Sequence, residues 1–233
     1  MIKKHIPNTI TCLNLLSGMI GIYFVLSGEI HYGLYFIVLA AIFDFLDGFV
    51  ARMLQVHSEI GKQLDSLADL VTFGVLPSFI FFQWILEISE FSYFPFIAFS
   101  MGIFSAIRLA KFNVDTRQSD RFIGVPTPAN ALLIGSIPFL VDRFPDMEIW
   151  LVTPVSLAVI AIIMSLLLVA ELPLIALKFK SFDFKSNVFR YLTIGVALIC
   201  IASLGWAGIP ITIISYIALS VVEGMIAKND QKA

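Results

Sequence analysis

The chain has 233 residues, of which 59% are hydrophobic and 14% are charged, and its mean hydropathy is +0.94. This composition excludes an ordinary soluble domain and indicates an integral membrane protein with several spans. The formal net charge of -2 provides no general basic surface, which argues against a nucleic-acid partner.

Apolar segments of roughly 17–25 residues, the length that crosses a bilayer, recur along the whole chain. We predict an all-α fold, a single polytopic transmembrane domain over residues 1–233 with about eight helices. The fifth and seventh segments are the shortest. In chain order the predicted spans are 9–27, 32–54, 64–86, 91–112, 127–141, 150–172, 188–203 and 206–227.

The basic residues predict how these spans are oriented. With eight spans, every Lys and Arg except Arg143 falls on the side that also holds both termini. Cytoplasmic loops of membrane proteins carry an excess of Lys and Arg. We therefore predict a protein of the cytoplasmic membrane with both termini in the cytosol.

Four aspartates lie near the cytoplasmic ends of the second and third predicted spans. Asp44 and Asp47 are three residues apart, and Asp65 and Asp69 are four apart, so each pair shares one helix face. Ionisable groups inside membrane segments are by default functional-site candidates. Facing carboxylates require a cation, and all-oxygen ligation by Asp suits Mg²⁺ or Mn²⁺, two of which could share the four groups.

Two small residues and a cation accompany the aspartates on the second span. Gly48 and Ala51 would let a flat base or sugar approach the helix backbone, and Arg52 offers a charged fork to a phosphate or a pyrimidine carbonyl. Individually, Gly and Ala are common packing residues of membrane helices, and an Asp–Arg pair is often structural. The joint pattern favours a site for a diphosphate.

A motif of eight fixed positions combines these residues: Asp44-x-x-Asp47-Gly48-x-x-Ala51-Arg52, then eight residues, then Gly61-x-x-x-Asp65-x-x-x-Asp69. The motif resembles, without departure, the signature of the CDP-alcohol phosphotransferase family. The resemblance implies a membrane enzyme, usually dimeric, that moves a phosphatidyl-type group from a CDP-linked lipid to an alcohol and releases CMP. It also implies two divalent ions and a site that opens to the cytosol.

The resemblance further implies roles for individual residues. The four aspartates would hold the metals, and Asp69 would also act as the general base. For Asn8 and Thr11, helix capping is an equally good interpretation, and Ser58 alone could be a solvated turn residue. The residues that the resemblance places around the CDP-lipid are Asn8, Thr11, Gly48, Ala51, Arg52, Ser58 and Gly61.

Three later segments bear on the acceptor alcohol. SLADLVTFGVLPS (66–78), RLAKFNV (108–114) and FIGVPTPAN (122–130) resemble the branch of the family that joins CDP-diacylglycerol to L-serine. Because serine carries a carboxylate, we expect a cation for it: Arg108, assisted by Lys111, with Asn113 as a hydrogen-bonding partner. Arg108 and Lys111 could instead be ordinary anchors at the membrane interface.

Two other functions stay open. A sibling enzyme would use glycerol phosphate, inositol phosphate or another polyol, and Arg117 and Arg121 could then bind the phosphate of that acceptor. A transporter could also carry carboxylates inside its helices as an ion relay. The sequence lacks the internal repeats of inverted topology that many transporters show.

Overall fold

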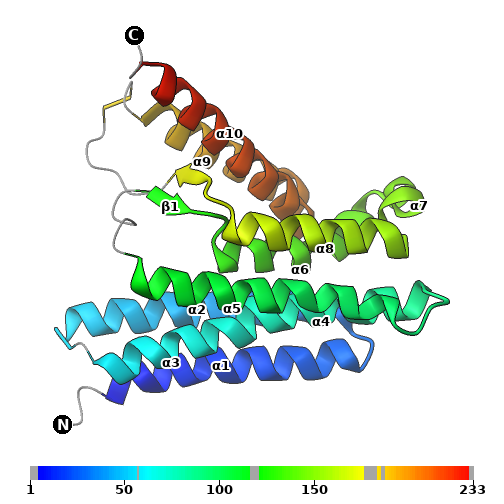
Figure 1. The fold of residues 1–233 in the computed structure, drawn as a ribbon, viewed down its shortest axis with the longest axis horizontal. Coiled ribbons are helices and arrows are strands. Elements are labelled where there is room, and N and C mark those ends of the chain that lie inside the picture. The colour runs from blue at the N-terminus through cyan, green and yellow to red at the C-terminus, as the bar shows by residue number, and fades with distance from the viewer. Residues whose placement is uncertain (1–4, 57, 116–120, 176–182, 185–186, 231–233) are drawn as a thin grey trace.

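Helices form nearly all of the regular structure (Figure 1). The computed structural model describes residues 5–56, 58–115, 121–175, 183–184 and 187–230. A π-helical turn, η2, interrupts one long helical run, and short 3₁₀ turns (η3, η4, η6) precede three helices. In chain order the elements are α1 (His5–Leu26), α2 (Ile30–Met53), α3 (Glu59–Asp69), η2 (Leu70–Val75), α4 (Leu76–Ile88), η3 (Phe94–Phe99), α5 (Ser100–Val114), β1 (Arg121–Ile123), α6 (Thr127–Arg143), η4 (Pro145–Met147), α7 (Glu148–Leu151), α8 (Pro154–Val169), β2 (Pro173–Ile175), α9 (Val188–Leu204), η6 (Gly205–Ala207) and α10 (Gly208–Asp230).

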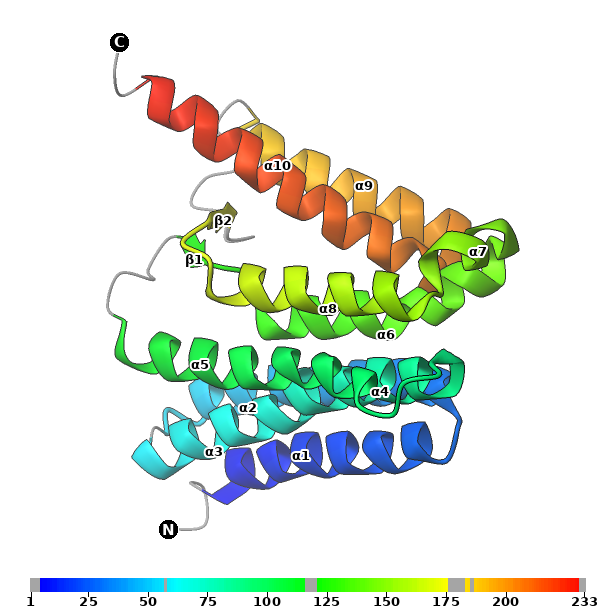
Figure 2. The same ribbon diagram turned by 45° about the vertical axis from the view of Figure 1, so that its right-hand side comes forward.

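The helices are arranged in successive layers (Figures 1 and 2). Helices α1 to α5 form one group, α6 and α8 pack on it through α2 and α5, and the α9–α10 hairpin lies beyond α6. The start of α1, the end of α2, the start of α3 and the end of α5 all lie on the left side in both views. The connections that we predicted to be cytoplasmic therefore gather at one end of the bundle.

The prediction of an all-α polytopic membrane protein is confirmed. Five helical runs are long and apolar enough to cross a membrane, and a sixth counts if a pair bent by 79°, Pro145–Leu151 and Pro154–Val169, is one span. One of the five, Val188–Ile226, contains both α9 and α10, which fold back on each other. The predicted number of spans, eight, and the predicted location of the termini in the cytosol stay predictions.

The bend falls inside the predicted sixth span, 150–172. Thr153 caps the start of α8 by accepting a hydrogen bond from the backbone N–H of Ser156 at 3.1 Å, and Pro154 occupies the first turn. A cap followed by proline is a typical helix start, because proline lacks the backbone N–H that a helix interior requires. Residues 150 and 151 consequently belong to the separate short helix α7.

Two short strands were not expected. Strands β1 and β2 pair antiparallel, with Arg121 opposite Ile175, and they join the connections that precede α6 and follow α8. The buried strand β2 is also fixed to α10: Tyr216 donates to the carbonyl of Ile175 at 2.9 Å, and Ser220 accepts from its N–H at 3.2 Å. These bonds satisfy the backbone of a buried connection.

The helical run from α3 through η2 to α4 passes through the centre of the core. Phe73, Leu76 and Ile80 from this run are fully buried. Helix α1 approaches η2 closely at Gly18, where a Cβ atom would lie 2.5 Å from Oγ1 of Thr72. This approach places the polar face of α1 beside the end of α3, where Asp69 lies.

Candidate metal and nucleotide site

Three carboxylates meet where α2 ends and α3 begins. One oxygen each from Asp44, Asp47 and Asp65 can be chosen so that all three lie within 4.8 Å of one another. Asp47 is buried, and the other two are half-buried. Same-sign charges this close repel strongly when water is excluded, and a set of carboxylate oxygens fits a hard divalent cation such as Mg²⁺ or Mn²⁺. The donor set therefore suits a divalent metal.

Asp69, the fourth aspartate of the motif, lies outside this group of three. It is one turn beyond Asp65 on α3, and its charge interacts with those of Asp44 and Asp65. Its Oδ1 atom accepts a hydrogen bond from Nδ2 of Asn14 at 3.1 Å. Asp69 is therefore adjacent to the triad but is held by a partner from α1.

Helix α1 supplies two side chains to the motif. Thr11 donates to Oδ2 of Asp47 at 2.6 Å, and its hydroxyl also lies 3.1 Å from the carbonyl of Pro7. Asn14, which was not predicted, donates a hydrogen bond to Asp69 from the next turn. The available signal was the spacing of Thr11, Asn14 and Ser17, three residues apart, which puts polar groups on one face of an apolar helix.

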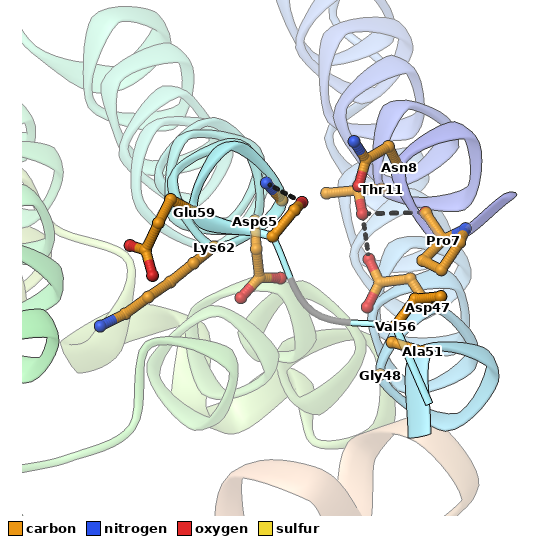
Figure 3. A pocket seen from close by; sticks show the side chains of 12 residues that line it. Pro7, Asn8, Thr11, Asp47, Gly48, Ala51, Val56, Glu59, Lys62 and Asp65 are labelled. Atoms are coloured by element: carbon orange, nitrogen blue, oxygen red, sulfur yellow. Dashed lines mark hydrogen bonds between the residues drawn. The ribbon is translucent and has the colours of Figure 1, made fainter. Parts of the chain in front are cut away.

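A cavity of about 590 Å³ opens beside the carboxylates, between the starts of α1 and α3 and the end of α2 (Figure 3). Asp47 and Asp65 form part of its wall. Pro7, Val56, Glu59 and Lys62 also line it and were not predicted. Six of the seven residues that we expected around a CDP-lipid line this cavity: Asn8, Thr11, Gly48, Ala51, Ser58 and Gly61.

Arg52, the seventh expected residue, is not among the residues that line the cavity. It lies in the last turn of α2 and is exposed. Its guanidinium extends beside Gly48, where a Cβ atom would lie 3.8 Å from Nη1. Arg52 therefore lies on α2, as predicted, but its long side chain runs along the outside of this helix and not into the cavity.

Ser58 and Gly61 form the beginning of α3. Ser58 accepts a hydrogen bond from the backbone N–H of Gly61 at 2.9 Å and so caps the helix. A Cβ atom on Gly61 would lie 2.8 Å from Oγ of Ser58 and 3.0 Å from Oδ1 of Asn8. Only glycine allows this approach. The packing at the start of α3 therefore explains why residue 61 is glycine, in addition to the expected ligand contact.

The residues expected to bind serine separate into two groups. Arg108 and Lys111 line a second cavity of about 340 Å³, between the end of α5, β1 and the end of α8. Asn113 does not line it, because its Nδ2 donates to Oγ of Ser66 at 2.8 Å and its carbonyl accepts from Lys62 at 3.1 Å. Asn113 therefore fixes the end of α5 to α3.

Among the side chains that the structure describes, Arg108 is the one buried Lys or Arg. It is 7% exposed, interacts electrostatically with Asp69 and Tyr216, and its guanidinium carbon lies 5.9 Å from the centre of the Phe112 ring. Among the described residues, its Nε has no hydrogen-bond partner. Arg117, considered for a phosphorylated acceptor, lies outside the described residues, and only the backbone of Arg121 is described.

Asn130, in the first turns of α6, is a second residue whose importance was not predicted. Its side chain is fully buried, and within the described part of the chain neither its amide nitrogen nor its amide oxygen has a hydrogen-bond partner. A buried unpaired polar group costs about 1–3 kcal/mol. Since α6 packs on η2 and α2, Asn130 is a further candidate for a functional role.

Comparisons with known proteins bear on this arrangement. Residues 4–213 match the family described as CDP-alcohol phosphatidyltransferase. Proteins named CDP-diacylglycerol–serine O-phosphatidyltransferase from Bacillus subtilis and Saccharomyces cerevisiae are 36% and 37% identical over 140 and 163 residues, and archaetidylserine synthase from Methanothermobacter thermautotrophicus is 33% identical over 135 residues. These matches cover 58%, 61% and 56% of this chain.

The same matches span 76% of the Bacillus protein and 56% of each of the other two. The family match includes α1 to α9, the beginning of α10 and the whole aspartate motif. This extent confirms the resemblance noted from the motif. The chain belongs to the CDP-alcohol phosphatidyltransferase family.

Proposed function

We propose that this protein transfers the phosphatidyl group of CDP-diacylglycerol to the hydroxyl of L-serine, forming phosphatidylserine and releasing CMP. The observation that carries this proposal is the cluster of three carboxylates from Asp44, Asp47 and Asp65, two of which, Asp47 and Asp65, form part of the wall of the 590 Å³ cavity. Family membership and relatives named for this reaction support it.

The three clustered aspartates would hold divalent metal, with Asp69 completing a set large enough for two ions. A bound divalent ion supplies positive charge that neutralises a diphosphate and a departing phosphate. The oxygen-only donors favour Mg²⁺ or Mn²⁺ over softer metals. Thr11 would assist by fixing one oxygen of Asp47, which leaves the other oxygen to the metal.

The CDP part of the donor would occupy the 590 Å³ cavity. Gly48 and Ala51 have small side chains, so a base or ribose could approach α2, and the start of α3, which borders the cavity, would favour a phosphate through its helix dipole. Asn8 and Ser58 provide polar contacts at the same place. Arg52 would act from the outer rim rather than from the wall.

Asp69 would act as the general base. It would accept the proton of the serine hydroxyl as that oxygen attacks the lipid phosphorus in line. The new bond joins the serine oxygen to phosphorus, and the bond from that phosphorus to the bridging oxygen breaks, so that oxygen leaves with CMP. No covalent intermediate with the protein is required.

Arg108 and Lys111 would bind the serine carboxylate. Arg108 suits this role because it is buried, lines a cavity and lies within electrostatic reach of Asp69. Arginine binds carboxylates in a planar, two-pronged geometry. Asn113 would contribute indirectly, by fixing the end of α5 on which Arg108 and Lys111 stand.

The protein would work in the cytoplasmic membrane as a homodimer, with the site facing the cytosol and the acyl chains in the bilayer. The distribution of Lys and Arg supports the orientation. The dimer rests on the family resemblance.

The deciding experiment is an acceptor panel. Purified protein is incubated with CDP-diacylglycerol, Mn²⁺ or Mg²⁺, and one of serine, glycerol phosphate, inositol phosphate or inositol, and CMP release is measured. We expect release with serine alone. Release with a phosphorylated polyol but not with serine would reject the proposed acceptor and leave the family chemistry intact.

A further inference from the structure

Two carboxylates of the motif each accept a hydrogen bond from a different residue of α1. Thr11 donates to Asp47, and Asn14, one turn further along, donates to Asp69. Both α1 side chains are buried, and Asn14 is fully so. Helix α1 thus contacts the motif at two points, one at the triad and one at the aspartate outside it.

Asn14 is itself held firmly in place. Its backbone carbonyl accepts a hydrogen bond from Oγ1 of Thr72 at 3.2 Å, so α1 is tied to η2 directly beyond Asp69. The close approach at Gly18, one turn further along α1, allows this contact. The amide that reaches Asp69 therefore stands on two elements that are fixed to each other.

The contact fixes one oxygen of Asp69. Nδ2 of Asn14 bonds to Oδ1 and not to Oδ2, so we expect Oδ2 to be the oxygen that faces a metal or a substrate proton. A hydrogen-bonded carboxylate is also limited in rotation, and partners of this kind commonly hold ligands of metals in their productive orientation. The partner of Asp69 would therefore influence the chemistry without touching substrate.

We propose that Asn14 is a positioning residue for Asp69, and that it sets metal affinity and turnover through the N–H···O bond rather than through packing. The effect on turnover rests on the proposed function. The effect on metal affinity rests only on the aspartate site itself.

The test compares side chains that separate hydrogen bonding from size. Asn14→Leu and Asn14→Gln both enlarge the side chain, but only Gln keeps an amide donor, whereas Leu keeps the branching of Asn and removes the donor. Ser17→Ala is the matched control, since Ser17 is buried on the same face of α1 but donates to the backbone carbonyl of Phe36 at 3.2 Å.

Mn²⁺ binding to each purified variant is titrated by electron paramagnetic resonance, and serine-dependent CMP release is measured at saturating Mn²⁺. We expect Asn14→Leu to weaken Mn²⁺ binding and to lower kcat, each by about 10- to 100-fold, with KM for CDP-diacylglycerol nearly unchanged. Asn14→Gln should retain more of both than Asn14→Leu, and Ser17→Ala should resemble the wild type.

Two results would overturn the inference. One is wild-type Mn²⁺ affinity and kcat in Asn14→Leu. The other is a larger loss in Asn14→Gln than in Asn14→Leu, because the loss would then not follow the hydrogen-bond donor. Failure of the proposed function looks different. In that outcome the wild type binds Mn²⁺ but releases no CMP with serine, and the Mn²⁺ titration still decides the role of Asn14.

Discussion

The two ends of the helical bundle use ionisable side chains in opposite ways. At one end, Asp44, Asp47 and Asp65 bring charges of one sign together in a partly buried place. At the other end, where α2 begins and α6 ends, His31 and Asp142 form a pair at 2.8 Å with side chains 39% and 64% exposed. The exposed pair is complete by itself, whereas the aspartate group requires a cation from outside the chain.

The packing around these groups differs in the same way. Near His31, aromatic rings fill the space: Phe24 stacks on Tyr32 with centroids 4.9 Å apart, and Phe139 lies edge-on to His31 at 4.9 Å. Near the aspartates, Gly48 and Ala51 border a cavity. Rings therefore fill the space at the His31 end, whereas a cavity opens at the aspartate end, as the proposed ligand site requires.

The largest effect is expected at Asp69. Asp69→Asn keeps the shape of the side chain but removes the proton acceptor, so turnover should fall by about 10²- to 10⁴-fold, the usual contribution of a general base. CMP release from purified protein measures the loss, and retention on immobilised CDP measures nucleotide binding. Near-normal turnover in this variant would remove Asp69 from the chemistry.

A smaller and different effect is expected at Asp47. Asp47→Asn should raise the Mn²⁺ concentration for half-maximal activity and the KM for CDP-diacylglycerol together, because this carboxylate belongs to the triad and to the cavity wall. Thr11→Val should do the same more weakly, by about 10-fold or less, since it removes only a hydrogen-bonding partner of that ligand. If metal dependence is unchanged in both variants, Asp47 is not a ligand.

Arg108 tests the acceptor side of the site. Arg108→Ala should raise the KM for serine by roughly 10- to 100-fold, the effect of losing a charge-assisted hydrogen bond of about 1.5–3 kcal/mol, while the KM for CDP-diacylglycerol changes little. Lys111→Ala, on the same cavity but exposed, should have a smaller effect. Serine kinetics that are unaltered in Arg108→Ala would show that the cavity beside α5 does not bind the acceptor.

The smallest effect is expected at the opposite end. His31→Ala should leave CMP release unchanged and alter stability by about 1 kcal/mol or less, because a polar pair this exposed contributes little. Thermal unfolding in detergent together with the activity assay measures both. A loss of activity as large as that of a triad variant would contradict the contrast between the two ends.

The aspartate triad could be predicted because its geometry is largely local: spacings of three and four residues determine a helix face, and a short connection joins the end of α2 to the start of α3. The contacts of Asn14 with Asp69 and of Asn113 with Ser66 join residues 55 and 47 positions apart. Such contacts depend on how α1 and α5 pack against α3, which the periodicity of one helix does not reveal.

The remaining differences have similar causes. Arg52 was placed correctly along α2, but the direction of a long side chain depends on its surroundings. The strands β1 and β2 pair only because two distant connections meet. The bend at Thr153 did have a local signal, a capping residue followed by Pro154, within an otherwise apolar stretch.

The most direct measurement is the anomalous scattering of Mn²⁺ in crystals of the protein grown with CDP. We expect an anomalous peak within bonding distance of carboxylate oxygens of Asp44, Asp47 and Asp65, next to the nucleotide in the cavity between α1, α2 and α3. A nucleotide bound in that cavity with no Mn²⁺ peak at those three residues, or with Mn²⁺ bound elsewhere, would show that the aspartates are not the metal site.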